Sequence, residues 1–402
     1  MRFLHCSDIH LGRRPVGKVG EFSRKRFDDY FAAFDRIIDI AIEHAVDAFL
    51  ISGDMFDRRE LGPEVLERSV DLLQRLKDKS IPVIVVEGNH DNVTFGQEHD
   101  SWLTFLENRK LIVRPSYTLD EQGYTFTPYL LDGIAFYGIG YPGAMVNETL
   151  TELAQHLKSE SRECVVLVHT APAGTDILPG TVDYAVLDLF EGRVLYMAGG
   201  HFHAARTYPE KQPFFFIPGS SEYWDLGERG RKGCLIFDTL TRTHTFHSSD
   251  PRRLLRFTVD ITATSESEAR KQLLSAVDDL DITQGEDIVL GECMMQSSVY
   301  LEPAWLEEQL MQRGALKSQI RIRYPGEEER KSVHAAMAAV EEIEEEVIRR
   351  WEFFGRHASD IVTAMDKLKG YQRERNQQLF FEQYDRLIES LMSDKEDADA
   401  DQ

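Results

Sequence analysis

The 402-residue sequence has few cysteines, no long apolar run and less positive than negative charge. The four cysteines stand far apart without a CxxC pair, which predicts buried thiols in a reducing cytosol and no disulfide framework. No run of about eighteen apolar residues exists, and the first residues lack the shape of a signal peptide. We therefore expect a cytoplasmic protein without membrane attachment.

The charge balance limits the classes of partner. A formal net charge of -23 argues against indiscriminate binding of nucleic acid over the whole surface, although it leaves room for a local basic groove. The sequence also has no internal repeat and no GxxxxGK[ST] phosphate-binding loop. A process that needs ATP would therefore require a partner to supply it.

Ligand-type side chains follow three consecutive apolar runs. The runs at 3–8, 48–51 and 82–86 predict buried strands, and helical periodicity at 28–44 and 63–76 separates them. In such a β-α-β-α-β unit the strands are parallel, and their carboxyl ends meet at one edge, where ligands bind. The residues at those ends are Asp8, His10, Asp54, Asn89 and His90. We expect Asp54 to offer one carboxylate oxygen to each of two cations.

The same design recurs further along the chain. The apolar run 165–168 precedes His169, and the run 194–197 leads through two glycines to His201 and His203. A lone histidine after a strand is usually structural, but the repetition favours a shared metal site. The mixed oxygen and nitrogen ligands suit manganese, iron or zinc. We expect the runs 214–220 and 234–237 to complete a second sheet.

In order, these motifs are D-x-H, GDxxD, GNHD, a lone strand-end histidine and GH-x-H, and the set resembles the calcineurin-like metallophosphoesterase superfamily. SDIHLG at 7–12 and IPGSSEYWDLGE at 217–228 are similar to the SbcD family of DNA double-strand-break repair nucleases. The resemblance covers residues 1 to about 250 by motif and the remainder by layout. It implies an α/β fold: a two-sheet sandwich flanked by helices, a small α+β cap domain and a C-terminal helical segment.

The resemblance also implies roles for individual residues. One cation would be held by Asp8, His10, Asp54 and His203, and the other by Asp54, Asn89, His169 and His201. Two manganese ions per chain are the implied cofactor, with iron, zinc or magnesium as alternatives. His90 would stabilise or protonate the leaving oxygen, with Asp57 orienting it. We expect Asp91 to be structural and to close the turn after Asn89 by side-chain hydrogen bonds.

Basic residues gather at two places that could contact a phosphate backbone. The first is the predicted loop 13–26, with Arg13, Arg14, Lys18 and Arg24, and the second is the entry to the cap, with Arg252 and Arg253. A solvated surface is the alternative interpretation for both.

Three domains are expected: a nuclease domain at 1–250, an α+β cap at 251–325 and a helical partner-binding segment at 326–402. The cap alternates predicted strands and helices, namely 254–261, 265–277, 288–293, 302–312 and 320–324. The last segment has apolar helical faces at 332–354 and from 359, and its acidic end from 394 is expected to be disordered. The resemblance implies that this segment docks on an SbcC-like coiled-coil ABC-type ATPase and that the protein is a homodimer.

Three functions compete at this point. The leading one is a two-metal-dependent DNA exonuclease or endonuclease that acts in double-strand-break repair with an SbcC-like ATPase. The alternative is a metallophosphoesterase for a smaller nucleotide or another phosphodiester, which the net charge of -23 favours. The third is a repair scaffold with a decayed site, and the intact set of ligand-type residues argues against it.

Overall fold

The computed structural model describes residues 1–15, 20–91, 101–173, 180–296 and 299–324, with a few positions between 361 and 387. It divides into two compact units. The first comprises 1–255 with 281–289 and 310–318, and the second comprises 256–280, 290–309 and the residues from 319 onward. Lys18 and nearly all of the predicted partner-binding segment lie outside the described residues.

The first sheet has the strand order β15-β14-β1-β2-β3, with β1 (Arg2–Cys6), β2 (Ala48–Ser52), β3 (Val83–Val86), β14 (Gly233–Asp238) and β15 (Thr243–Ser248). β1 pairs in parallel with β2, and β2 with β3, as the β-α-β-α-β pattern predicts. Side chains alternate between the two faces: Leu50 points into one apolar layer, and its neighbours Phe49 and Ile51 into another. Both faces of the sheet are therefore buried, which explains the continuous apolar runs.

The run 234–237 was predicted to belong to the second sheet, and this prediction was wrong. This run forms β14, which pairs antiparallel with β1 in the first sheet, and not with the strands of the second. The run 214–220 does contain a strand of the second sheet, β13 (Phe215–Ile217). Periodicity reveals that a strand is buried but not which sheet edge it covers, and here β14 covers the edge of β1 that would otherwise be open.

The second sheet has the order β12-β13-β11-β8-β7-β6. Its other strands are β6 (Tyr129–Leu131), β7 (Ile134–Ile139), β8 (Glu163–Val168), β11 (Tyr196–Ala198) and β12 (Arg206–Tyr208). β7, β8, β11 and β13 run parallel to one another. Two short strand pairs complete the region: β4 (Ser116–Asp120) with β5 (Gly123–Thr127), and β9 (Ala171–Pro172) with β10 (Thr181–Val182).

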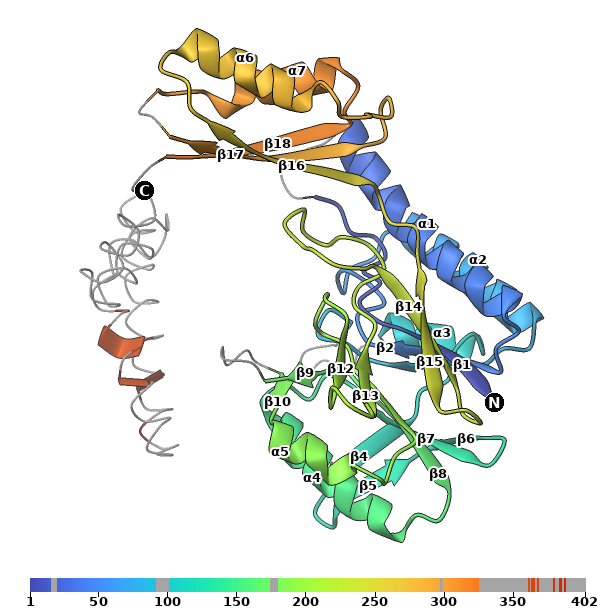
Figure 1. The fold of residues 1–402 in the computed structure, drawn as a ribbon. Helices are drawn as coiled ribbons and strands as arrows, with labels where there is room; N and C mark the ends of the chain where they lie inside the picture. The colour runs from blue at the N-terminus through green and yellow to red at the C-terminus, as the bar shows by residue number, and fades with distance from the viewer. Residues whose placement is uncertain are drawn as a thin grey trace, which may run out of the picture. The chain divides into compact units, whose positions relative to one another are not determined.

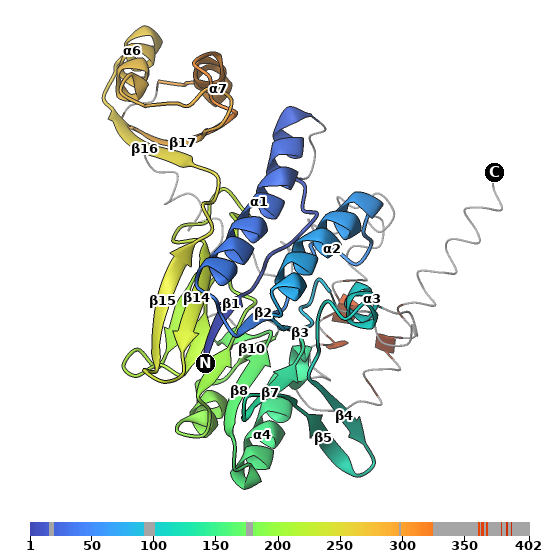
Figure 2. The same cartoon turned by 90° about the vertical axis from the view of Figure 1, so that its right-hand side faces the viewer.

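Helices cover the outer face of each sheet, which gives four layers (Figures 1 and 2). On the first sheet lie α1 (Glu21–Glu43), α2 (Pro63–Asp78) and α3 (Trp102–Asn108). On the second lie α4 (Val146–His156) and α5 (Tyr184–Leu187), with short 3-10 turns at Gly143–Met145, Leu157–Ser159 and Asp188–Phe190. α1 begins at Glu21, so Arg24 belongs to this helix and not to the predicted loop.

A third apolar layer joins the inner faces of the two sheets. It includes Phe3 and Leu50 from the first sheet, and Phe136, Leu167 and Tyr196 from the second. The two-sheet sandwich flanked by helices is therefore confirmed. Because the layer is closely packed, it fixes the strand ends of one sheet relative to those of the other.

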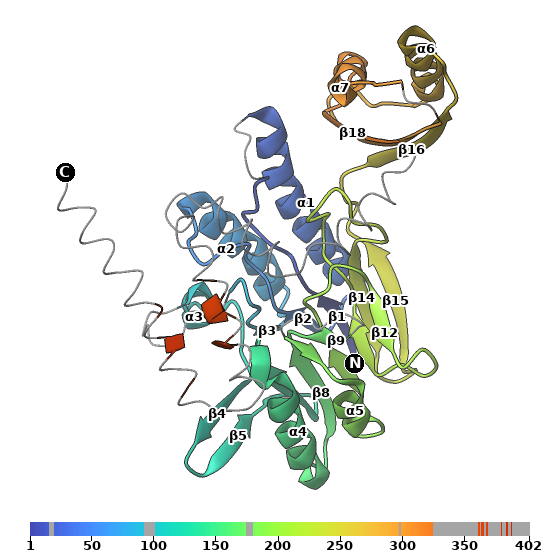
Figure 3. The ribbon, with the colours of Figure 1, turned by 90° about the vertical axis from the view of Figure 1, so that its left-hand side faces the viewer.

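The second unit holds most of a three-stranded sheet, β16-β17-β18, whose strands are β16 (Leu254–Ile261), β17 (Ile288–Met295) and β18 (Lys317–Arg323). α6 (Glu266–Val277) and α7 (Pro303–Gln312) lie on one face of that sheet (Figure 3). The order β-α-β-α-β agrees with the elements predicted for the cap. Among the described residues, no helix is both long and apolar enough to span a bilayer.

Candidate metal centre

All seven predicted metal ligands lie in the described chain, at the carboxyl ends of strands from both sheets. In the first sheet, β1 is followed by Asp8 and His10, β2 by Asp54, and β3 by Asn89. In the second sheet, β8 is followed by His169, and β11 by His201 and His203. Ligand atoms lie within 4.8 Å of one another in three groups: Asp8, His10 and His203; Asp8, Asp54 and His169; and His10, Asp57 and His90. The strands thus bring together residues up to 195 positions apart in the sequence.

One half of the site is formed by Asn89, His169 and His201. Asn89 Oδ1 lies 3.1 Å from both His169 Nε2 and His201 Nδ1. His169 is completely buried, and its other nitrogen, Nδ1, donates to the main-chain oxygen of Ser52 at 2.8 Å. That contact uses Nδ1 and fixes the orientation of the ring, so Nε2 is the nitrogen that faces the centre.

The other half is formed by Asp8, His10 and His203. The Nε2 atoms of His10 and His203 are 3.2 Å apart, and His203 Nε2 lies 3.9 Å from Asp8 Oδ1. His203 Nδ1 donates to Glu228 Oε1 at 2.6 Å, which again leaves Nε2 facing the centre. Unlike His169, His203 has 21% of its side chain exposed.

Asp54 lies between the two halves. Its Oδ2 is 3.5 Å from His169 Nε2 and 3.8 Å from His10 Nε2. Its Oδ1 accepts a hydrogen bond from the main-chain nitrogen of His90 at 2.9 Å. Oδ2 thus lies toward both halves while Oδ1 accepts the hydrogen bond from His90, and the expectation of one oxygen for each cation stays a prediction.

The backbone is unusual at four of these residues. Asp8, His10, Asp54 and His201 have φ values of 51°, 51°, 49° and 75°, in the left-handed region that non-glycine residues seldom adopt. Glycine permits the close approach beside them, since a Cβ on Gly88 would lie 2.0 Å from Asp54 Oδ1. The backbone is therefore strained at the residues whose side chains meet at this site.

The electrostatics of the site fit a shared cation-binding carboxylate. Burial opposes ionisation of Asp54, but the charge and hydrogen bond of His169, with the charges of His10 and His90, lower the pKa of Asp54 below its usual range. For His169, burial also opposes charge, yet Asp54 raises its pKa to about 9. At His169 the negative potential of Asp54 thus exceeds the cost of burial, whereas at His10 burial lowers the pKa well below its usual value despite the charge of Asp54.

Buried atoms without partners indicate what fits the site. Within the described part of the chain, Asp8 Oδ2 and His10 Nδ1 are buried and have no hydrogen-bond partner. Only Asp8 Oδ2 bears on the centre, because His10 faces it with Nε2 and its Nδ1 lies 3.9 Å from Asp57 Oδ1. Such atoms are rare because each costs about 1–3 kcal/mol of stability. Carboxylate, amide and imidazole donors directed at one point satisfy divalent transition metals, so the residues present fit such cations.

His90 and its neighbours adjoin the centre. His90 Nδ1 donates to the main-chain oxygen of Asp57 at 2.6 Å, so Asp57 orients His90 through its backbone and not its carboxylate. The Asp57 carboxylate instead binds Arg13 at 3.1 Å. Asp91 closes the turn as expected, since it accepts hydrogen bonds from the main-chain nitrogens of Gly88, Met55 and Phe56.

Glu228, Lys232 and Trp224 were missed by the sequence reasoning. Glu228 binds both His203 Nδ1 and Lys232 Nζ at 2.6 Å, and the Lys232 side chain is fully buried. Trp224 packs on His203 with ring centroids 5.7 Å apart, and the guanidinium of Arg13 lies 3.4 Å from the Trp224 ring centroid. The 217–228 motif marked this stretch, but no spacing rule identifies which of its residues supports a ligand.

A buried chain of hydrogen bonds beneath the site was also missed. Tyr196 Oη lies 2.9 Å from His5 Nδ1, His5 Nε2 lies 2.7 Å from Ser52 Oγ, and Ser52 Oγ donates to the Gly199 oxygen at 2.7 Å. Since the Ser52 hydrogen goes to Gly199, His5 Nε2 donates and His5 Nδ1 accepts from Tyr196. Burial lowers the pKa of His5 to about 3, so the ring is neutral.

Most of the arginines predicted to contact DNA already have carboxylate partners. Arg13 binds Asp57, and Arg24 binds Asp28 and Glu64. The remaining pairs join Arg252 to Asp29 and Glu286, and Arg253 to Asp281 and Asp287. Arg14 is exposed and lies over the Phe27 ring. A role of these arginines in DNA binding stays a prediction, but their charges are largely compensated.

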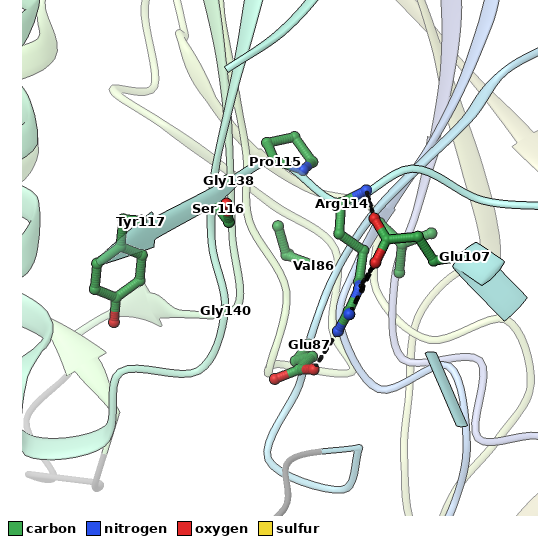
Figure 4. A pocket seen from close by; sticks show the side chains of 10 residues that line it. Val86, Glu87, Glu107, Arg114, Pro115, Ser116, Tyr117, Gly138 and Gly140 are labelled. Atoms are coloured by element: carbon green, nitrogen blue, oxygen red, sulfur yellow. Dashed lines mark hydrogen bonds and ion pairs between the residues drawn. The ribbon is translucent and has the colours of Figure 1, made fainter. Parts of the chain in front are cut away.

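A separate pocket of about 360 Å³ has none of the proposed ligands in its lining (Figure 4). Its arginine, Arg114, is held between Glu87 and Glu107, with a shortest contact of 2.7 Å to Glu87. Glu87 directly precedes the Gly88–Asn89 turn, so this network braces the end of β3. A guanidinium bound on both sides by carboxylates is not available to an anionic ligand.

Known proteins resemble the chain over about half of its length or more. The calcineurin-like phosphoesterase family matches residues 1–205, about half of the 402 residues. The chain is 30% identical over 213 residues to the DNA double-strand break repair protein Mre11 of Sulfurisphaera tokodaii, which covers 52% of this chain and 50% of the relative. With the protein of the same name from Methanosarcina mazei, identity is 26% over 343 residues, or 79% of this chain and 49% of the relative.

The chain spans about half the length of the curated relatives it matches. Among solved structures, TT1561 of Thermus thermophilus matches 62% of this chain and 98% of its own, with a TM-score of 0.38 and 14% identity. That value is too low to support a functional argument.

Proposed function

This chain belongs to the calcineurin-like phosphoesterase family, and on that premise we propose that it is a two-metal-dependent DNA nuclease of double-strand-break repair. The observation that carries the proposal is the convergence of seven ligand-type side chains, with Asp54 Oδ2 facing both halves. A family of metallophosphoesterases implies divalent metals. Their number, two per chain, and their identity, manganese, belong to the proposal.

Each half of the site would hold one cation. Asp8, His10, Asp54 and His203 would ligate the first, and Asp54, Asn89, His169 and His201 the second. Cations in such a pair supply Lewis-acid polarisation of a phosphodiester and ease deprotonation of the attacking water. Asn89 adds a neutral oxygen, which leaves more positive charge at its half than another carboxylate would.

His90 would serve the leaving oxygen. Its Nδ1 donates to a carbonyl that can only accept, so Nε2 is the atom that gives or takes a proton. The fixed Nδ1 contact also holds the ring in one orientation, 4.9 Å from the His10 ring. We assign proton donation to the departing 3′ or 5′ oxygen to His90 Nε2.

DNA is the proposed substrate because the matched relatives are named as DNA double-strand break repair proteins. The alternative is a smaller nucleotide or another phosphodiester. Two observations favour that alternative: the net charge of -23, and the carboxylate partners of Arg13, Arg24, Arg252 and Arg253.

A substrate panel separates the two candidates. The purified chain with manganese is offered linear duplex DNA, single-stranded DNA and bis(p-nitrophenyl) phosphate. Cleavage of both DNA and the aryl ester supports the nuclease. Cleavage of the aryl ester alone favours the small-substrate enzyme, and no cleavage of either refutes both.

Replacing His90 with Ala tests the proton-transfer role. We expect manganese content near that of the wild type, because no proposed ligand is lost, and a rate loss on the order of 10²–10⁴, the usual contribution of general acid–base catalysis. Atomic absorption and steady-state kinetics give the two values. A parallel fall of rate and metal content would instead make His90 a ligand.

The proposal extends to partners and location. Residues 326–402 would dock on an SbcC-like coiled-coil ABC-type ATPase, and the chain would act as a cytoplasmic homodimer. The four buried free cysteines support a reducing compartment. Deletion of 327–402 should abolish co-purification with such an ATPase and preserve aryl phosphodiesterase activity. A truncated protein that aggregates would instead assign the segment to the nuclease core.

A further inference from the structure

We infer that a groove beside the metal centre, formed around Arg206 and Arg229, binds the phosphate next to the scissile one in a nucleic-acid strand. This inference rests on the proposed function, because it states how a strand, and not merely one phosphodiester, is held. The groove has a volume of about 400 Å³, and the residues that line it include His201, Phe202, His203, Arg206, Glu228 and Arg229. Two proposed metal ligands therefore share its wall with two arginines.

These arginines differ from four of the five arginines predicted on sequence alone, because the structure places no acidic partner among its described residues beside them. Arg206 and Arg229 are both exposed, and neither forms an ion pair with any residue that the structure describes. By contrast, Arg13 and Arg252 are bound to carboxylates. On a chain with a net charge of -23, uncompensated guanidinium groups beside a metal centre mark a site for an anion.

Phe202 holds one of the two guanidinium groups in place. The guanidinium carbon of Arg206 lies 5.0 Å from the Phe202 ring centroid, and Phe202 stacks on His201 at 5.9 Å with an interplanar angle of 26°. Phe202 stands between the two ligands His201 and His203 in the sequence. A guanidinium over a ring keeps its N–H edges free, and those edges match phosphate oxygens.

The acidic residue of the groove does not repel a phosphate strongly. Glu228 already binds His203 and Lys232, each at 2.6 Å, so its charge is compensated. Arg206 belongs to β12 and Arg229 to the segment after Glu228, so the two arginines approach the groove from different elements. A mononucleotide whose only phosphate occupies the metals leaves the arginines empty, whereas a longer strand reaches both places.

Direct binding tests the groove without requiring cleavage. The full chain, loaded with manganese, is titrated into a labelled short oligothymidylate with phosphorothioate linkages, and fluorescence anisotropy gives the dissociation constant. For Arg206→Gln/Arg229→Gln we expect affinity to fall roughly tenfold or more, the effect of losing charge-assisted hydrogen bonds. The log–log salt slope should flatten by about 0.7, the value for one single-strand phosphate contact.

A double variant of equal charge change serves as the matched control. Arg193 and Arg231 are exposed and form no ion pair with described residues, and Arg231 also lies over a ring, 4.3 Å from the Phe246 centroid. Neither lines the groove. Arg193→Gln/Arg231→Gln should therefore leave the dissociation constant and the salt slope unchanged. If both double variants weaken oligothymidylate binding equally, the loss comes from the lower positive charge of the protein as a whole, and the inference is overturned.

Variants that keep the positive charge test whether the charge of the two arginines accounts for the binding. Arg206→Lys/Arg229→Lys keeps the charge and should recover most of the lost affinity and the wild-type salt slope. Thymidine 5′-monophosphate, which reaches only the metals, should bind the glutamine and wild-type proteins with nearly equal affinity. If the glutamine variant binds oligothymidylate as tightly as the wild type, the phosphate-binding role of the groove is refuted and the nuclease function is not. If the wild-type protein leaves DNA uncut in the substrate panel, the nuclease function itself is refuted.

Discussion

The two halves of the proposed metal centre are held by different kinds of contact. His169 is completely buried and donates to a main-chain carbonyl, and that carbonyl belongs to Ser52, part of the buried hydrogen-bond chain with His5 and Tyr196. His203 is partly exposed and donates to the carboxylate of Glu228, which Lys232 in turn binds. One half is therefore an extension of the core, and the other is an electrostatic assembly near the surface.

The difference shows how one fold can build a rigid half and an adjustable half of the same site. A main-chain carbonyl cannot be changed by substitution, so the position of His169 depends on the strand that carries Ser52. A carboxylate partner raises the basicity of a histidine and can be altered by a single change. We therefore expect substitutions on the His169 side to affect folding and those on the His203 side to affect metal affinity.

Asp54→Ala should have the largest effect, because Asp54 Oδ2 faces both the buried half and the partly exposed half of the metal centre. We expect both cations to be lost and activity to fall to background while circular dichroism shows a folded chain. Metal analysis checks the loss. Two manganese ions retained per chain would disprove the shared role of Asp54.

Glu228→Gln should affect only the half that includes His203. Glutamine keeps one oxygen for Lys232 but removes the charge that supports His203, so one of the two cations should bind about 10–100-fold more weakly. Calorimetric titration with manganese resolves the two sites. Glu210→Gln, an exposed change of the same charge, is the matched control and should leave both affinities unaltered. Equal weakening of both sites by Glu228→Gln would remove the distinction between the halves.

His5→Phe should act on the buried half through stability. The change leaves Tyr196 Oη and Ser52 Oγ without their partner, at a cost of about 1–3 kcal/mol in the free energy of unfolding. Because burial lowers the pKa of His5 to about 3, the unfolded chain binds its proton first as the pH falls. The contribution of His5 to stability is thus complete above pH 6.5, the unfolded value, and is lost progressively toward pH 3.

The pH dependence provides a test that a simple packing defect would not reproduce. Between about pH 5.5 and 4.5, where the unfolded chain binds the proton and the folded chain does not, wild-type unfolding free energy should fall by about 1.4 kcal/mol per pH unit more than that of His5→Phe. Urea unfolding at several pH values measures this difference. Parallel curves for the two proteins would show that His5 is not held neutral in the folded state.

The positions of the proposed ligands were predictable because each follows a strand, and parallel strands end at a common edge. Asp8, Asp54, Asn89, His169 and His201 were all placed by that rule. Their supports were not predictable in the same way. Ser52 acts through its main-chain oxygen, which every residue has, and Glu228 reaches His203 from a separate loop.

The pairing of charges was equally hidden from the sequence. Arg24 was expected in a loop open to DNA, but α1 begins at Glu21 and places Arg24 beside Asp28 and Glu64. Composition counts charges, whereas only the folded chain shows which are already neutralised. The same limitation explains why Arg206 and Arg229 attracted no attention, since their value lies in the absence of a described acidic neighbour.

The left-handed backbone at Asp8, His10, Asp54 and His201 has a consequence for how such a protein could lose its activity over generations. Glycine, asparagine, aspartate and histidine tolerate that conformation better than other residues do. Drift at these positions would therefore pass most easily through asparagine or glycine, which relieve strain while weakening or removing a ligand. A descendant that had abandoned catalysis would keep its fold, and it would be recognised by those two residues at these four positions.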